Sequence, residues 1–329
     1  MTMPLNLHLH TETWNYKFPF RITGRCYTDK TVVVVELSDG LRVGRGESWP
    51  VYYCDETIDS VVSDIESIAA TVKKGLSRET LQQLLPAGGA RNAIDCALWD
   101  LECKQQGKTI WELTGVTSNP IATAYTLGIE ESPDEVAKKA LKAKAYPLLK
   151  IKLDQDCPVA RIEAVRAARP DARLVIDANQ GWSFEQLVEV APQLASLGVE
   201  MIEQPLPRGQ DDVLKDYTAP VPLCADESCL HRGELEQAAE RYQMINIKLD
   251  KAGGLTEALA LARQVKAMGL EVMVGNMGGT SLAMAPGMVI AQFCRYIDLD
   301  GPLLLKYDRL SGLTYQGERI PSLDPALWG

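Results

Sequence analysis

Residues 148–153 read Leu-Leu-Lys-Ile-Lys-Leu, a short apolar run that is interrupted by two lysines. Seven similar runs lie around it in the back two-thirds of the chain, and six of the eight carry a charged residue at or near the C-terminal end. From Lys152 to Lys248 these charged residues follow one another at steps of 22 to 26 residues. Such spacing is typical of strand–helix units, which need about five residues of strand, about a dozen of helix and two short loops. The eight runs are 123–129, 148–153, 173–178, 199–203, 222–226, 244–249, 271–275 and 296–300.

The segments between these runs have the marks of helices. Pro133 and Pro158 stand where a first helical turn is expected, and Ser183 with Gln186 fits a capping box. Eight strands with seven helices between them predict a (β/α)7β barrel, an α/β fold with one helix fewer than the usual TIM barrel. Because the C-terminal ends of barrel strands open on one face, we expect the charged residues to meet there. The predicted helices are 133–146, 158–169, 183–196, 211–218, 232–240, 254–268 and 280–293.

The first third of the chain follows a different pattern. Three strands are predicted, with a hairpin turn at Ser38-Asp39-Gly40, since glycine accepts the positive φ of such a turn. Three helical segments follow, in which apolar residues recur at the helical period. Antiparallel strands followed by helices predict an α+β unit. The strands are 3–12, 30–37 and 41–48, and the helices are 57–74, a segment that starts at 77, and 90–106.

The chain is therefore predicted to contain an N-terminal α+β domain and a modified, TIM-like (β/α)7β barrel. The boundary is placed at Asn119-Pro120, so that the α+β domain covers 1–119 and the barrel 120–302. The last stretch, 303–329, has no strong period and contains Pro321 and Pro325. We expect it to be an irregular tail that packs back on the first domain.

Composition excludes several classes of function. The net charge of −10 argues against binding to nucleic acid or to an anionic membrane surface. No apolar run reaches the ~18 residues that a membrane helix needs, and residues 1–10 lack the basic start and apolar stretch of a signal peptide. A cytoplasmic location is expected, and a homo-oligomer is left open. The eight cysteines contain no C-x-x-C pair, which favours free thiols in a reducing compartment.

Three acids end three consecutive predicted strands. Asp177, Glu203 and Asp226 should therefore lie side by side at the mouth of the barrel. Each alone is read most simply as a strand-end residue that faces solvent. Three carboxylates packed together repel one another and are costly without a cation. Because Mg²⁺ prefers oxygen ligands, the trio predicts a Mg²⁺ site.

Lysines flank these acids on both sides. Lys150 and Lys152 share one face of the second strand and should point into the barrel, and Lys248 ends the sixth strand opposite them. Salt bridges between lysines and acids inside the barrel would explain one lysine per site, but they do not explain lysines on both sides. A lysine near another ammonium and a dication should have a lowered pKa and can act as a base. A metal between two opposed bases suits removal of the proton α to a carboxylate through a metal-stabilised enediolate, and hence racemisation or epimerisation.

These segments resemble the muconate-lactonizing subgroup of the enolase superfamily over nearly the whole chain. The resemblance implies an α+β capping domain, one Mg²⁺ held by the three acids, and Lys152 and Lys248 as the two catalytic bases. The segments that carry it are Lys150-x-Lys152, Asp-Ala-Asn at 177–179, Glu-Gln-Pro at 203–205, Asp-Glu-Ser at 226–228 and Lys248-Leu-Asp-Lys-x-Gly-Gly.

The end of the eighth strand narrows the expected substrate. Asp298 and Asp300 are two residues apart, so both carboxylates should point at the substrate, where they call for a cationic group such as a free ammonium. This D-x-D resembles that of the dipeptide epimerases, in which the pair holds the dipeptide's N-terminal ammonium. Asp300 could instead belong to a strand-ending turn, but a turn does not need Asp298. The alternatives are o-succinylbenzoate synthase or muconate cycloisomerase chemistry on the same scaffold, or a non-catalytic binding protein.

The resemblance implies that side-chain specificity comes from mobile loops of the capping domain and from the barrel ends. Here the loops are expected around 18–27 and 48–54. Arg25 lies in the first and could pair with an acidic side chain, which resembles the L-Ala-D/L-Glu epimerases that act on murein peptides. Arg21 is equally close in sequence, and a solvated loop arginine or a different dipeptide specificity is left open. The segment 275–281, with its paired glycines, could also line the pocket.

Overall fold

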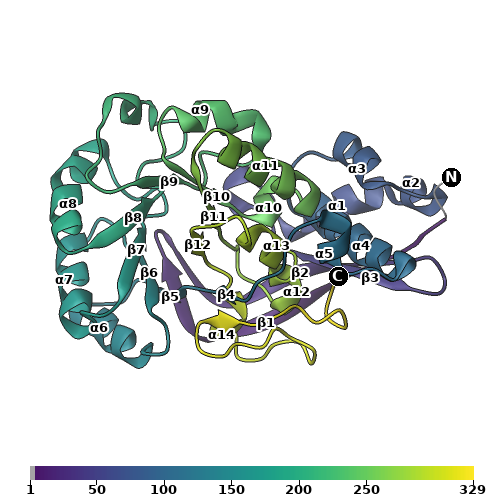
Figure 1. The fold of residues 1–329 in the computed structure, drawn as a ribbon, viewed down its shortest axis with the longest axis horizontal. Helices are drawn as coiled ribbons and strands as arrows, with labels where there is room; N and C mark the ends of the chain where they lie inside the picture. Colours follow the sequence, from purple (N-terminus) through teal and green to yellow (C-terminus); the bar gives the residue numbers. More distant parts are fainter. Residues whose placement is uncertain (1–3) are drawn as a thin grey trace.

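The computed structural model describes residues 4–329, and its N-terminal part is an antiparallel sheet covered by helices (Figure 1). The strands β1 (Asn6–Ile22), β2 (Arg25–Ser38) and β3 (Val43–Ser48) pair in that order. Strand β2 is rich in valine because both of its faces are buried. Val33 and Val35 pack among the N-terminal helices, whereas Val32 and Val34 pack into the core that continues through the barrel.

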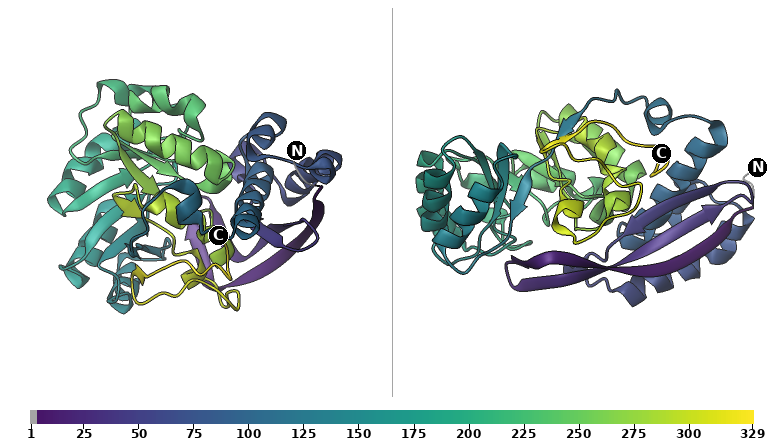
Figure 2. Two further views of the ribbon diagram at one scale, coloured as in Figure 1. Left: turned by 45° about the vertical axis from the view of Figure 1, so that its right-hand side comes forward. Right: turned by 90° about the horizontal axis from the view of Figure 1, so that it is seen from below.

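The hairpin of β1 and β2 is longer than expected. The predicted strand 3–12 continues to Ile22, although its first residue lies outside the described part of the chain. The predicted loop at 18–27 is wrong, because Phe20–Ile22 pairs with Arg25–Tyr27 and only a tight turn at Gly24 (φ 71°) remains. This hairpin extends from the N-terminal helices across to the barrel (Figures 1 and 2).

The N-terminal helices match the prediction apart from one break and one additional short helix. The predicted helix 57–74 is two helices, because Ile68 leaves helical geometry at φ −104° and ψ 4°. Helix α4 crosses β3 closely, since a Cβ at Gly44 or Gly46 would overlap its backbone. The helices are α1 (Ile58–Ser67), α2 (Ala69–Lys74), α3 (Arg78–Leu84), α4 (Gly89–Gln106) and α5 (Ile110–Thr114), preceded by the 3-10 turn Tyr52–Cys54.

The barrel has the predicted (β/α)7β architecture. Its eight parallel strands are neighbours in chain order, and the Ala124 amide donates to the Ile297 carbonyl at 2.7 Å, which links the two edge strands. The strands are β5 (Tyr125–Leu127), β6 (Leu148–Lys152), β7 (Arg173–Asp177), β8 (Val199–Glu203), β9 (Leu223–Ala225), β10 (Met244–Ile247), β11 (Glu271–Val274) and β12 (Tyr296–Ile297).

Three of the seven connections depart from the predicted helices. The connection at 211–218 is only a 3-10 turn, Asp212–Asp216, and that at 232–240 begins as one, Arg232–Glu234. The helix predicted at 280–293 is divided beside Pro286, because the nitrogen of proline carries no N–H that could donate a helical hydrogen bond. The helices are α6 (Pro133–Lys142), α7 (Pro158–Ala168), α8 (Phe184–Ser196), α9 (Leu235–Ala239), α10 (Leu249–Ala252), α11 (Leu255–Ala267), α12 (Ser281–Met284) and α13 (Gly287–Ala291).

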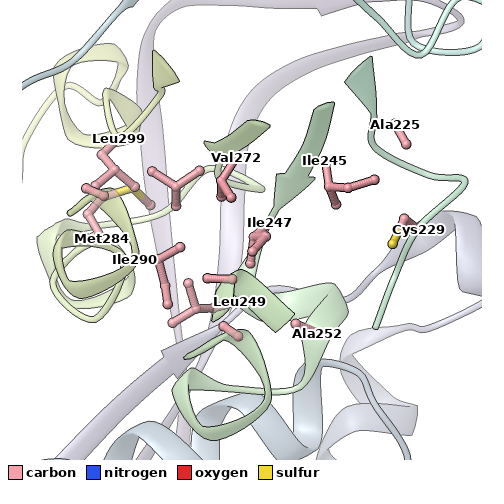
Figure 3. Close-up of a cluster of buried hydrophobic side chains, with 14 of the residues drawn as sticks. Ala225, Cys229, Ile245, Ile247, Leu249, Ala252, Val272, Met284, Ile290 and Leu299 are labelled. Atoms are coloured by element: carbon pink, nitrogen blue, oxygen red, sulfur yellow. The ribbon is translucent and has the colours of Figure 1, made fainter. Parts of the chain in front are cut away.

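The barrel wall has an apolar outer surface and a layered interior. Figure 3 shows Ile245, Ile247 and Val272 pointing outward against side chains of the covering helices. Since side chains alternate along a strand, the next residue on each strand points inward. One inward residue from each strand run forms a buried plug, and these are Ala124, Leu148, Val175, Met201, Cys224, Met244, Met273 and Tyr296. Two residues further along the runs stand Thr126, Lys150, Asp177, Glu203, Asp226, Asn246, Gly275 and Asp298, so that a mostly polar layer lies directly on an apolar one.

The C-terminal tail returns to the N-terminal part, as expected. After α14 (Gly301–Leu304), strand β13 (Arg319–Ile320) pairs with β4 (Ile121–Ala122). At its end Trp328 is fully buried, and its Nε1 donates to the carbonyl of Cys96 in α4 at 2.9 Å. The division of the chain at residues 119 and 302 stays a prediction.

Two expectations from composition can be compared with the structure. All eight cysteines are free, as predicted. Within residues 4–329, no helix combines the length and the apolar character needed to cross a bilayer. The expected cellular location and the oligomeric state stay predictions.

Truncating Trp328 should destabilise the protein strongly. Trp328→Ala removes a fully buried indole and its hydrogen bond, so we expect the free energy of unfolding to fall by about 3–5 kcal/mol. Urea unfolding followed by circular dichroism measures this. Leu310→Ala, at a fully exposed side chain of the same tail, is the matched control and should change stability by less than about 0.5 kcal/mol. Equal stabilities for the two variants would mean that the tail does not hold the N-terminal part in place.

Candidate active site

The tip of the β1–β2 hairpin lies on the C-terminal ends of the barrel strands. Thr23 Oγ1 donates to the carbonyls of Leu153 and Ala178 at 3.3 and 3.0 Å, just beyond β6 and β7. The Ile129 amide, beyond β5, donates to the carbonyl of Arg21 at 2.9 Å. The hairpin therefore covers the face on which the charged strand ends were expected to meet.

A cavity lies between this cover and the barrel, and each part contributes a different chemistry to it. The barrel supplies mainly ionisable groups, which include Lys152, Glu227, Lys248, Asp298 and Asp300. The N-terminal part supplies mainly aromatic groups and one lysine, which are Tyr16, Phe20, Tyr27, Lys30, Trp49, Tyr52 and Tyr53.

The three predicted acids meet at the floor of this site. Asp177 and Glu203 are paired in register on β7 and β8, and Asp226 follows β9. All three are fully buried, and one oxygen from each lies within 4.8 Å of the others. Glu203 Oε2 accepts no well-directed hydrogen bond, although it lies 2.7 Å from Lys150 Nζ. The three carboxylates form a buried, all-oxygen donor set of the kind that binds a hard cation.

The predicted lysines surround this cluster. Lys152 Nζ lies 2.6 Å from Asp177 Oδ2, and Lys248 Nζ lies 2.5 Å from Asp226 Oδ2 on the other side. Lys150 Nζ contacts three carboxylates, those of Asp177, Glu203 and Asp298, at 3.2, 2.7 and 3.0 Å. The structure therefore brings the lysines and acids together as the alternation of strand side chains predicted.

The ionisation of the acids reflects this crowding. Burial acts to raise the pKa of Asp177 and Asp226, but the nearby lysines outweigh it and lower both. Burial and the Asp177 carboxylate raise the pKa of Glu203 to about 7, against the opposing effect of Lys150. One member of the cluster therefore holds a proton more readily than the others.

The pKa of Lys248 reflects the carboxylates around it. Burial acts to lower the pKa of Lys248, but Asp226 and Glu203 outweigh it and raise it. The lowering expected from the sequence supposes a dication beside the lysine, and it stays a prediction.

The acidic pair at the eighth strand lies beyond the strand itself, because β12 ends at Ile297. Asp298 Oδ1 lies 3.2 Å from Thr126 Oγ1, and Asp300 Oδ2 accepts from the Thr126 amide at 2.6 Å. Burial and the neighbouring Asp298 charge raise the pKa of Asp300 well above its usual range. The pKa of Asp298 is lowered, because Lys150 outweighs the effect of burial. Both acids line the cavity, and the opposite shifts of their pKa values favour a single negative charge on the pair.

Arg25 lies apart from the cavity lining. Its exposed guanidinium stacks on the ring of Tyr52 at 4.0 Å from the centroid. Arg21 is also turned outward and lies 3.9 Å from the Glu131 carboxylate. The segment 276–278 lines the cavity as expected.

Sequence reasoning missed two buried lysines. Lys251 Nζ lies 2.8 Å from Asp226 Oδ1 and also donates to the backbone carbonyl of that residue. Its position in α10, three residues after Lys248, was the signal that could have placed it. Lys30 lines the cavity from β2, and its alternation with Val32 and Val34 was the corresponding signal.

Family models match both parts of the chain. "Mandelate racemase / muconate lactonizing enzyme, N-terminal domain" matches residues 5–115, and "Enolase C-terminal domain-like" matches residues 134–309. These matches agree with the superfamily that the sequence segments resemble.

Individual proteins are similar over most of the chain. L-Ala-D/L-Glu epimerase of Escherichia coli (strain K12) is 44% identical and covers 90% of this chain and 93% of its own. N-acetyl-D-glutamate racemase of Pseudoalteromonas sp is 42% identical and covers 91% and 95%. A crystal structure of an enolase family member from Agrobacterium tumefaciens, with homology to dipeptide epimerases, has a TM-score of 0.96 at 44% identity. It contains bound sodium and L-Ala-L-Glu, and the alignment covers 99% of this chain and 100% of that one.

Proposed function

Since the chain belongs to the mandelate racemase and muconate lactonizing enzyme family of the enolase superfamily, we propose that it is a Mg²⁺-dependent dipeptide epimerase that interconverts L-Ala-L-Glu and L-Ala-D-Glu. The superfamily and the isomerase class, both predicted from sequence, are confirmed. The observation that carries the proposal is the placement of a lysine on each side of a buried three-acid cluster. The elimination and cycloisomerisation alternatives are not favoured by these relatives.

Asp177, Glu203 and Asp226 are the residues that would hold Mg²⁺. They offer carboxylate oxygens within 4.8 Å of one another, and this buried all-oxygen donor set fits a hard cation. When bound, Mg²⁺ supplies positive charge that stabilises the negative charge developing on the substrate carboxylate. Lys150, which contacts both Asp177 and Glu203, holds these carboxylates in place and adds positive charge beside them.

Lys152 and Lys248 are assigned to proton transfer at the α-carbon of the C-terminal residue. They come from strands on opposite sides of the acid cluster and both reach the cavity. One removes the α-proton from one face, and the other returns a proton to the opposite face of the planar enediolate. Because each lysine serves one epimer as base and the other as acid, the reaction runs in both directions.

Asp298 and Asp300 are assigned to the N-terminal ammonium of the dipeptide. Both line the cavity, and the Thr126 hydroxyl and amide orient them. An arriving ammonium would favour the ionised form of Asp300, whose pKa is raised by burial and by Asp298. The pair can therefore bind the ammonium with two charge-assisted hydrogen bonds.

A dipeptide panel tests the proposed activity. The protein is incubated with Mg²⁺ and L-Ala-L-Glu, or with hydrophobic and cationic L-Ala-X dipeptides, and diastereomers are resolved by proton NMR. Appearance of L-Ala-D-Glu at the highest rate is expected. Turnover of another dipeptide, or of N-acetyl-glutamate alone, would overturn the assigned substrate.

Asp300→Asn should separate dipeptides from N-acylated amino acids. The variant keeps an acceptor for the Thr126 amide but loses the charge that faces an ammonium. We expect kcat/KM for L-Ala-L-Glu to fall about 10- to 100-fold, because a hydrogen bond to a charged group is lost. Any activity on N-acetyl-glutamate, which has no ammonium, should fall much less. Equal losses on the two substrates would contradict the ammonium role.

A further inference from the structure

Lys30 is placed in the cavity by the strand pattern of β2. It shares a face with Val32 and Val34, which pack into the core that continues through the barrel, so its side chain points toward the barrel mouth. It is 4% exposed and lines the same cavity as Lys152 and Lys248. It is therefore a third lysine of the cavity, and it comes from the cover.

The surroundings of Lys30 hold its ammonium without neutralising it. Its Nζ lies 3.6 Å from the ring centroid of Trp49 and 5.2 Å from that of Tyr27, and it donates to the carbonyl of Met277. Among residues 4–329, no carboxylate oxygen lies within 4.0 Å of this nitrogen. By contrast, Lys152 and Lys248 each contact a carboxylate. A buried ammonium without an anion is costly, and this one has a single carbonyl acceptor for its three protons.

The charges around Lys30 also favour the binding of an anion beside it. The pKa of Lys30 is lowered to about 7, mainly by burial; Asp250 opposes this shift, and Lys248 and Lys152 add to it. Asp250 is itself occupied, because its Oδ1 accepts from Ser48 Oγ, the Trp49 amide and Asn92 Nδ2 at 2.9–3.0 Å. An additional anion beside Lys30 would therefore be stabilised electrostatically.

The glycine of the neighbouring loop keeps this position accessible. A Cβ at Gly278 would lie 2.6 Å from Lys30 Nζ and 2.9 Å from the hydroxyl of Tyr16. Any side chain at residue 278 would occupy the space between Lys30 and Tyr16. Gly278 also has φ of 83°, which glycine adopts without strain. The loop thus brings its backbone to Lys30 and adds no side chain.

We propose that Lys30 binds a carboxylate on the substrate side chain and thereby selects an acidic dipeptide. The inference rests on the proposed epimerase function and identifies the residue that contacts the side chain of the substrate. The face of Trp49 and the carbonyl of Met277 orient the ammonium, and the substrate carboxylate completes its contacts. Arg25, which sequence reasoning assigned to this role, is exposed and stacked on Tyr52.

Paired substrates test this role directly. L-Ala-L-Glu and L-Ala-L-Gln differ only in the charge of the side chain, so the ratio of their kcat/KM values measures charge recognition. In Lys30→Met, which keeps the apolar stem against Trp49, we expect this ratio to fall about 10- to 100-fold, mainly through L-Ala-L-Glu. The ratio of kcat/KM values for L-Glu-L-Ala and L-Gln-L-Ala measures charge recognition at the N-terminal residue. Comparing the two pairs shows which side chain of the dipeptide Lys30 contacts.

Two further variants separate charge from structure. Lys30→Gln can still donate to the Met277 carbonyl but has no charge, so it should lose the preference for glutamate as Lys30→Met does. Lys73→Met, at an exposed lysine of α2, is the matched control and should keep the wild-type ratio. Circular dichroism melting curves check that each variant is folded.

The outcomes are distinct. Equal losses on both dipeptides of each pair, or a wild-type ratio in Lys30→Gln, would overturn the inference and leave Lys30 as a support for the 276–278 loop. A changed ratio in Arg25→Met but not in Lys30→Met would return the role to Arg25. If the wild-type protein epimerises no dipeptide at all, the proposed function fails before Lys30 is tested.

Discussion

Replacing either Lys152 or Lys248 by alanine should abolish interconversion of L-Ala-L-Glu and L-Ala-D-Glu. Each variant lacks one of the two groups that exchange a proton with the α-carbon, so we expect kcat for epimerisation to fall by at least about 10⁴-fold. Each should nevertheless exchange the α-proton of one epimer with solvent, because the remaining lysine still faces that proton. Proton NMR in D₂O, started from each pure epimer, measures both rates.

The two variants should have opposite preferences in this exchange assay. If Lys152→Ala exchanges only one epimer, Lys248→Ala should exchange only the other. Lys142→Ala, at an exposed lysine of α6, is the matched control and should behave as the wild type. Epimerisation at the wild-type rate in either active-site variant would show that the two-lysine mechanism is wrong.

Replacing Glu203 by glutamine should remove Mg²⁺ binding and activity together. The change is nearly isosteric and keeps an acceptor for Asn246 Nδ2, which lies 2.7 Å from Glu203 Oε1. It removes one of three carboxylate charges, so we expect the affinity for Mg²⁺ to fall at least about 100-fold. Titration calorimetry with Mg²⁺ measures the affinity, and urea unfolding in EDTA should show no loss of stability. Unchanged Mg²⁺ affinity would place the metal elsewhere.

The pH dependence of metal binding follows from the same residue. The pKa of Glu203 is raised to about 7 in the metal-free protein, from an ordinary value of 4.5. Because the ligand must be deprotonated, Mg²⁺ affinity should rise as the pH increases from 5.5 to about 8. The folded protein binds this proton more tightly than the unfolded chain does. Protonation of Glu203 therefore stabilises the protein without Mg²⁺ at low pH, and this contribution falls as the pH rises from 4.5 to 7. Both trends should be weaker in Glu203→Gln.

The barrel and most of its site could be predicted because strand alternation links sequence directly to geometry. Lys150 and Lys152 are two residues apart, so both point inward, and in-register pairing then brings Lys152 beside Asp177 and Asp177 beside Glu203. The same two-residue step separates the apolar plug from the polar layer. Local pattern was therefore sufficient wherever the neighbours along the sheet follow one another in the chain.

Prediction failed where long-range packing decides the structure. The segment 18–27 looks like a loop, but it pairs as a hairpin that is held by barrel carbonyls more than a hundred residues away. The place of Lys30 depends on the second buried face of β2, which exists only because the barrel covers it.

The most direct test of the central claim is deuterium incorporation by the Mg²⁺-loaded wild-type protein. L-Ala-L-Glu is incubated in D₂O, and the α-position of the glutamyl residue is followed by NMR and mass spectrometry in substrate and product. Two opposed lysines predict that the L-Ala-D-Glu formed carries a solvent deuterium at this carbon from the first turnovers. Product that keeps the original proton, or a substrate that neither exchanges nor epimerises, would contradict removal of the α-proton by one of these lysines and its replacement by the other.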